Sequence, residues 1–347
     1  MRGTFVFENL PRVDVTISLQ PDHRRDGDRA MYAAFTTLRI LGTWLAPFPG
    51  STVSLTPQRT HWWTAAASMA PEFAVARALS REYWTRLIDM RAMPPSFVAG
   101  LSEYAARRAV SKIVDERYQA IYRSRAEGRY FGGFVPRELR VPLRVEDEGD
   151  PIGTDAPDAR MLLTLGTLER WTGRPVFDAI LLEFVHAAAG TQPTLDDFVS
   201  VASRVSGQNL SWLFDEALKH DRTFDYGIQT FDSRPGGDGR FRTTLVVQRV
   251  GDAVFDRPIP VQITFADGDS VRESWDGRTA ARTFEYRSPS RAVSAEVDPD
   301  RMLLLDRNRR NNGVTLDSDA ARTAATRWSA RWMIWLQDAL LTYVALT

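Results

Sequence analysis

Apolar and polar residues alternate near the start of the chain. Apolar side chains occupy every second position from Val13 to Leu19, which is the period-two pattern of a half-buried strand. Between residues 28 and 45 the apolar residues recur at helical spacing, and residues 52–55 form a second short alternating segment. The first 56 residues therefore predict the order strand, helix, strand.

Helical periodicity dominates the next part of the chain. The apolar positions predict helices over residues 70–89, 95–125, 157–172, 176–188, 194–205 and 210–218. Thr194, which is followed by acidic residues, is a good N-cap, and the pair Ser206 and Gly207 is typical of a helix end. We therefore expect residues 66–226 to be mainly helical.

The pattern changes near Tyr226. Short segments rich in β-branched and aromatic residues predict strands at 228–233, 240–249, 259–265, 270–274, 281–287 and 292–297, and Asp-Gly pairs between some of them are hairpin signals. A last helical pattern covers residues 319–347. We predict an α+β multidomain fold: a mainly helical domain over residues 1–226, a small antiparallel β-sandwich domain over 227–312, and a C-terminal helix over 313–347.

Composition narrows the class of protein. The chain has 347 residues, which is more than one hydrophobic core usually organises. Its formal net charge is zero, so no global basic field favours nucleic acid, and the absence of cysteine excludes disulfides and thiolate metal sites. The N-terminus lacks the apolar core of a signal peptide, and no run of about 18 apolar residues predicts a membrane span. As the sequence stands, we expect a cytoplasmic protein.

Two neighbouring segments carry a resemblance to a known family. The segment ALSREYW at residues 78–84 is followed by PSFVAGLSEY at 95–104. Together they resemble the core of the gluzincin aminopeptidases, the membrane alanyl aminopeptidase-like zinc metallopeptidases, whose members are often exported or membrane-associated. In that family two histidines of an HExxH helix bind zinc, the glutamate between them is the general base, and a second helix supplies a carboxylate ligand.

The chemistry of that family is missing from the matching positions. When Tyr83 and the following tryptophan are placed on the family's aromatic pair, Arg77 and Arg81 fall on the two histidines and Ala78 falls on the general base. Ala99 falls on the carboxylate ligand. The family's substrate-binding strand and catalytic tyrosine also have no counterpart at 56–69 and 155–158. The resemblance thus implies the fold without bound zinc, and we expect no cofactor.

Further segments extend the resemblance along the chain. QPTLDDF at residues 192–198 and SGQNLSWLF at 206–214 are similar to the helical region of the family, and residues 297–308 are similar to the strand that closes the β-sandwich in bacterial members. The resemblance therefore implies that the first domain is the remnant of a thermolysin-like peptidase domain, and that the chain matches the C-terminal portion of the family.

Four residues are candidates for a remaining cleft. Glu103 lies one turn after Ala99 in the second helix, and we predict that it pairs with Arg77 or Arg81 where zinc would sit, with Glu72 or Asp89 as further acids. The alternative is that one or both arginines turn out to solvent. The other three candidates are the adjacent His61, Trp62 and Trp63. These would either line a cleft and stack on a ligand or form a packed aromatic corner.

The C-terminal helix has an aromatic stripe. Trp328, Trp332 and Trp335 recur at i, i+4 and i+7. We expect this stripe to dock on the body of the protein, because three exposed tryptophans would form a large apolar patch. Contact with a membrane surface is the alternative, and it is not favoured.

Three functional hypotheses follow from these patterns. The first is a non-catalytic homologue of a zinc aminopeptidase with a binding or assembly role and a peptide or protein partner. The second is an active zinc metallopeptidase with atypical ligands. The third is a truncated gene product without selected function. Metal content separates the first two hypotheses, and cellular abundance with a stable partner separates the first from the third.

Overall fold

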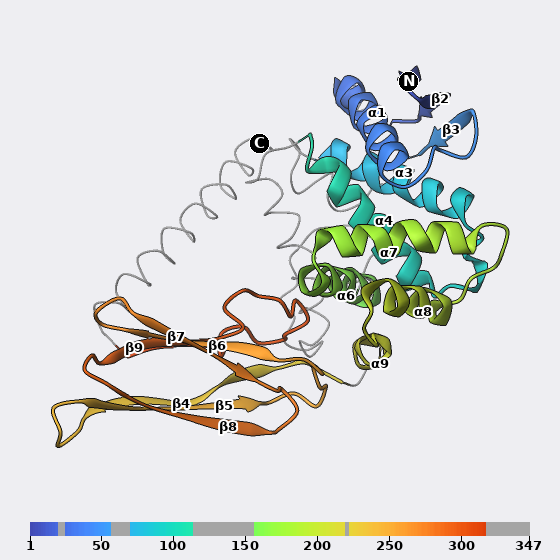
Figure 1. Cartoon of the computed structure of the whole chain (residues 1–347). Coiled ribbons are helices and arrows are strands. Elements are labelled where there is room, and N and C mark those ends of the chain that lie inside the picture. Colours follow the sequence, from blue (N-terminus) through green and yellow to red (C-terminus); the bar gives the residue numbers. More distant parts are fainter. Residues whose placement is uncertain (20–24, 57–69, 114–155, 219–221, 317–347) are drawn as a thin grey trace, which may run out of the picture. The chain divides into compact units, whose positions relative to one another are not determined.

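The computed structural model describes residues 1–19, 25–56, 70–113, 156–218 and 222–316. Contacts divide the chain into two compact units, one formed by Met1–Ser211 and one that begins at Trp212. The described residues combine helices with sheets whose strand pairs are mostly antiparallel, which agrees with the predicted α+β class (Figure 1). This division assigns most of the last helix before residue 226 to the second unit. The boundary that we predict between residues 226 and 227 remains a prediction.

The first unit opens with a three-stranded sheet. Its strands are β1 (Arg2–Phe7), β2 (Leu10–Ile17) and β3 (Thr52–Leu55), in the order β1-β2-β3. The pair β2-β3 is parallel, so the chain must cross between the two strands, and α1 (Gly27–Trp44) makes that connection. The predicted strand, helix and strand are confirmed. Strand β1 was not predicted, because Phe5 is the only one of its residues that is buried and the strand shows no alternation.

The helices of the first unit lie close to their predicted positions. They are α3 (Ala70–Leu87), the short 3-10 helix η2 (Met90–Ala92), α4 (Pro95–Val110), α6 (Ala156–Thr172), α7 (Arg174–Ala188) and α8 (Leu195–Ser206). Helix α4 ends at Val110 rather than at residue 125, and residues 114–155 lie outside the described ranges. None of the helices in the described ranges has both the length and the hydropathy needed to cross a membrane.

The caps of α8 confirm a local prediction. The Thr194 hydroxyl accepts a hydrogen bond from Asp197 N at 3.3 Å, and the Asp197 carboxylate accepts one from Thr194 N at 2.7 Å. This reciprocal capping box satisfies backbone donors that a helix start leaves free. Gly207 ends the helix with φ of +67°, a left-handed conformation that glycine adopts without strain.

Close packing around α4 forms the core of the first unit. Helix α4 packs against α3 on one side and against α6 on another. Three aromatic rings, Phe97 of α4, Phe184 of α7 and Phe198 of α8, meet edge to face with centroid separations of 4.9 to 6.5 Å. A side chain at Gly100 would begin 2.8 Å from Met161 Cγ, so glycine allows α4 to approach α6 closely.

The second unit contains α9 (Ser211–Leu218) followed by two antiparallel sheets (Figure 1). One sheet has the order β4-β5-β8, and the other has the order β10-β9-β6-β7. The strands are β4 (Tyr226–Pro235), β5 (Phe241–Arg249), β6 (Ile259–Phe265), β7 (Ser270–Trp275), β8 (Ala281–Ser288), β9 (Ala292–Val297) and β10 (Gly313–Thr315). The sheets meet through the rings of Tyr226 and Trp275, whose centroids are 5.4 Å apart. All six predicted strands are present, and β10 is an additional one.

Candidate functional site

The site suggested by the sequence lies on helices α3 and α4, which pack against each other. On α3 the residues Leu79, Tyr83 and Trp84 are fully buried, whereas Arg77 is half-buried and Arg81 is exposed. The arginines therefore lie off the buried stripe of the helix. This orientation keeps both guanidinium groups within reach of water, where their charge costs little.

Glu103 does not pair as predicted. Its side chain is 1% exposed, and Oε1 accepts a hydrogen bond from Arg107 Nη2 at 3.0 Å. Among the described residues no ion pair joins it to Arg77 or Arg81. The reason is local geometry, because Arg107 lies one turn further along the same helix and reaches the carboxylate without crossing between helices.

The other acids near this helix pair also have arginine partners. Glu72 binds Arg29 of α1 through two hydrogen bonds, of 2.7 and 2.9 Å. Asp89 accepts hydrogen bonds from Arg91 and from Gln192, and the Arg91 guanidinium holds the pKa of Asp89 well below its usual range. Asp89 therefore acts as an anion in its ion pair and not as a proton carrier near neutral pH.

A polar cluster lies near the C-terminal end of α4. Arg108 forms a two-pronged ion pair with Asp178 of α7, with 2.7 Å between Nη2 and Oδ2, and its guanidinium lies 3.7 Å from the ring centre of Trp44. Tyr104, which belongs to the motif of α4, packs on Phe177 at 5.0 Å, and burial raises the pKa of its hydroxyl above the usual range. The cluster ties α1, α4 and α7 together, and sequence reasoning missed it because its members lie far apart in the chain.

The donor set on α3 and α4 does not fit zinc. A guanidinium remains protonated and offers no lone pair to a metal, and the side chains of Ala78 and Ala99 have no donor atoms. In the part of the chain that the structure describes, no group of three or more histidine, aspartate or glutamate side chains could hold a metal ion. No chemical step can therefore be derived through zinc at these residues. The candidates His61, Trp62 and Trp63, like the C-terminal tryptophans, lie outside the described ranges.

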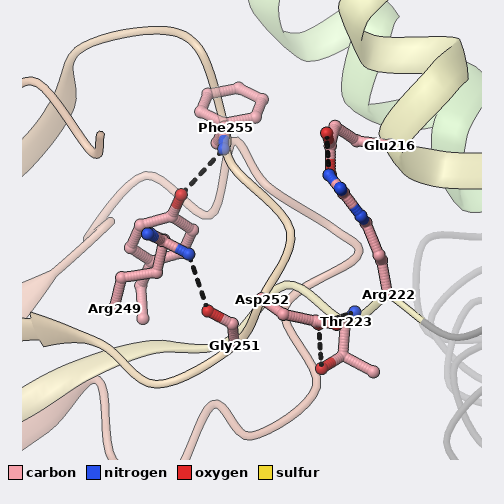
Figure 2. A network of polar contacts seen from close by, with 8 residues as sticks. Glu216, Arg222, Thr223, Arg249, Gly251, Asp252 and Phe255 are labelled. Carbon is pink, nitrogen blue, oxygen red and sulfur yellow. Dashed lines mark hydrogen bonds and ion pairs between the residues drawn. The ribbon is translucent and has the colours of Figure 1, made fainter. Parts of the chain in front are cut away.

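A second polar network lies in the second unit. Figure 2 shows the Glu216–Arg222 ion pair, the bond of 2.6 Å from Thr223 N to Asp252 Oδ1, and Arg249 donating to a loop carbonyl. The backbone N–H of Phe255 donates to the Tyr226 hydroxyl at 2.7 Å. Each of these contacts holds either the segment between β5 and β6 or the residues just before β4. The network therefore has a structural role.

Comparison with known proteins supports the fold. No protein-family profile and no curated protein matches the sequence. Among solved structures, the chain is similar to aminopeptidase A of Legionella pneumophila, determined with aspartic acid, at 11% identity and a TM-score of 0.56. The chain shares the fold of part of that aminopeptidase. The match covers 88% of this chain but only 38% of that one. An M1 zinc metallopeptidase from Deinococcus radiodurans also matches, at 17% identity and a TM-score of 0.43, over 63% of this chain and 51% of the other. The resemblance inferred from the sequence thus agrees with the Legionella aminopeptidase at the level of the fold.

Proposed function

We propose that this chain is a non-catalytic homologue of a zinc aminopeptidase, with a binding or assembly role. The observation that carries the proposal is the chemistry of the α3–α4 pair. Where the resemblance places two histidines, a general base and a carboxylate ligand, the chain has Arg77, Arg81, Ala78 and Ala99. Among the described residues the nearest acids are held by arginines, so this helix pair offers neither a ligand set for a metal-bound water nor a free carboxylate that could act as the general base.

The same residues suggest what this surface binds. Arg77 and Arg81 lie one helical turn apart, and within the described residues neither of them makes an ion pair. Two neighbouring guanidinium groups favour a carboxylate, because they offer it charge-assisted hydrogen bonds. The proposed partner is therefore a peptide or protein segment that presents an acidic group to α3.

The direct test combines metal analysis with a peptidase assay. The chain is purified in metal-free buffer and its zinc content is measured beside hydrolysis of fluorogenic aminoacyl substrates. We expect substoichiometric zinc and no hydrolysis above that of a buffer blank. Stoichiometric zinc that is lost when residues of α3 or α4 are changed would contradict the proposal.

A restoration variant tests the assignment of the positions. In the quadruple variant Arg77→His, Ala78→Glu, Arg81→His and Ala99→Glu, the helix pair regains two imidazoles and a carboxylate, so we expect it to bind zinc. The matched control keeps the first three changes and carries Ala99→Gln, which removes the anionic ligand, and it should bind zinc more weakly. If both variants fold and neither binds zinc, the correspondence with the zinc helices is wrong.

A further inference from the structure

Strand β1 of the first unit is an edge strand. The sheet order β1-β2-β3 places β2 on one side of β1 and no described strand on the other. Met1 and Ile17 exchange two backbone hydrogen bonds, of 2.8 and 2.9 Å, so they form a hydrogen-bonded pair of the antiparallel ladder. Because such pairs alternate with pairs that are not bonded, the backbone N–H and C=O groups of Arg2 and Thr4 point away from β2, and those of Val6 continue the alternation along the strand. This edge is therefore a template on which another strand can pair.

Apolar side chains are exposed beside the free edge. Among the described residues five large apolar side chains are exposed, and four of them belong to β1, to the residue before it or to α1. These four are Met1, Val6, Phe7 and Tyr32, with exposed fractions of 48, 74, 40 and 58%. Tyr32 lies on the same stripe of α1 as Phe35, whose ring is 5.9 Å from that of Phe5 in β1. Apolar side chains gathered in this way at a sheet edge are typical of an interaction surface.

Opposite charges lie at the two ends of β1. Arg2 begins the strand and Glu8 follows its last residue, and both side chains are exposed. Among the described residues neither of them forms an ion pair. Six positions of extended chain separate them by about 20 Å, so they cannot pair with each other within one subunit. Each charge is available to a partner that lies along the edge.

A second copy of the chain complements this edge in one register. When two β1 strands pair antiparallel about a two-fold axis at Phe5, Arg2 lies opposite Glu8 of the partner subunit. Thr4 then lies opposite Val6 of the partner subunit, and both residues direct their backbone groups at the neighbouring strand, as the ladder requires. The symmetry repeats each pair, so two ion pairs close the two ends of the contact.

The side of β1 that faces α1 agrees with the same register. Phe5 lies opposite Phe5 of the partner subunit, and Gly3 lies opposite Phe7 of the partner subunit, whose ring covers the space that the glycine leaves. Aromatic cross-strand pairs of this kind stabilise antiparallel strands. A shift of two residues in either direction preserves the backbone pairing but leaves both charges without a partner. The charges therefore select one register.

We infer that β1 is a self-association surface, on which two copies of this chain pair their β1 strands antiparallel and join their sheets into one. The partner is a second copy because the edge is complementary to itself in charge, in backbone groups and in aromatic residues. The contact is short, and short contacts are typical of weak, reversible association. The inference concerns β1 and α1 and does not rest on the proposed function of α3 and α4.

A charge swap tests the register. Sedimentation equilibrium of the whole chain at low ionic strength should give a dimer dissociation constant on the order of micromolar. Arg2→Glu places acids opposite each other at both ends of the contact, and Glu8→Arg places arginines opposite each other, so each change should raise the dissociation constant about tenfold. The double variant Arg2→Glu with Glu8→Arg regains both ion pairs and should return to within about threefold of the wild type. The control Arg242→Glu reverses an exposed arginine on β5 and should leave the dissociation constant unchanged.

A backbone variant tests the pairing apart from charge. Val6→Pro removes an N–H that points to solvent in the single subunit and into the neighbouring strand in the dimer. It should keep the circular dichroism spectrum of the wild type and abolish the dimer. A dimer that survives this change, or a double charge variant as dissociated as the single ones, would overturn the inference. So would a wild-type chain that stays monomeric up to about 0.1 mM. Co-sedimentation of that monomer with phosphatidylcholine vesicles would assign the exposed apolar residues to a lipid surface instead.

Discussion

Replacement of Gly100 by alanine tests why the α4 motif has glycine at this position. The new Cβ atom would lie 2.8 Å from Met161 Cγ, 2.9 Å from Met161 Cβ and 3.0 Å from Leu162 N. None of these atoms is the free end of a flexible side chain, so relief requires the α6 backbone to move. Such overpacking typically costs about 1–3 kcal/mol, and the distances favour the upper half of that range.

Helix propensity offsets part of this cost. Alanine is about 1 kcal/mol more favourable than glycine within a helix. The expected net effect of Gly100→Ala is therefore a loss of about 1–2 kcal/mol in the free energy of unfolding. Urea unfolding followed by tryptophan fluorescence measures it as a lower midpoint at unchanged slope, since Trp84 is buried in the adjacent helix.

Gly42→Ala is the matched control. Gly42 also lies in a helix, α1, and its new Cβ would meet Leu10 Cδ1 at 2.9 Å and Cδ2 at 3.1 Å. These methyl groups end a flexible side chain and can rotate away, so the propensity gain should make this variant as stable as the wild type or slightly more stable. Equal stability of Gly100→Ala and the wild type, or equal destabilisation by both changes, would refute the close α4–α6 contact as the reason for the glycine.

Three further predictions concern buried polar groups. Ser80→Ala should leave the protein equally stable or stabilise it by about 1 kcal/mol, because the Ser80 hydroxyl is buried without a hydrogen-bond partner. The control Ser102→Ala removes a hydroxyl that donates to a carbonyl at 2.6 Å, so chemical denaturation should give it a lower free energy of unfolding than Ser80→Ala. Glu103→Gln should lower the free energy of unfolding by about 1–2 kcal/mol, because it replaces the charged acceptor of the Arg107 hydrogen bond by a neutral amide, and a melting curve unchanged from the wild type would contradict this. The folded-state pKa of Asp306, about 6, exceeds its unfolded value, so its contribution to stability is complete below about pH 4 and is lost as pH rises through 6. Tm measured from about pH 4.5 to 7.5 should show this fall, and Asp306→Asn should remove it.

The sequence by itself determined those helices and strands whose apolar spacing or end residues are set within the element itself. Strands β6 and β9 occupy the predicted residues, 259–265 and 292–297. In β6 the side chains alternate regularly between the core and the other face of the sheet. The boundaries of α8 follow from Thr194 and Gly207, whose effects are confined to one turn of the helix. The resemblance to the zinc aminopeptidases was also visible in the sequence, and the similarity to the Legionella aminopeptidase agrees with it in fold.

Tertiary structure decided everything that depends on which partner a charged or polar group finds. The acid Glu103 was expected to pair with Arg77 or Arg81, but it forms an ion pair with Arg107, because a residue one turn further along the same helix lies within reach of its carboxylate. Strand β1 has no alternation of apolar and polar residues that would predict it, because only one of its side chains is buried. Its pairing with β2 holds it in place. The meeting of Asp225 with Asp306 and Asn312 joins residues more than 80 positions apart. Spacing in a sequence predicts contacts only across a few helical turns or a hairpin, whereas the energy of a buried charge depends on whichever groups the folded chain brings around it.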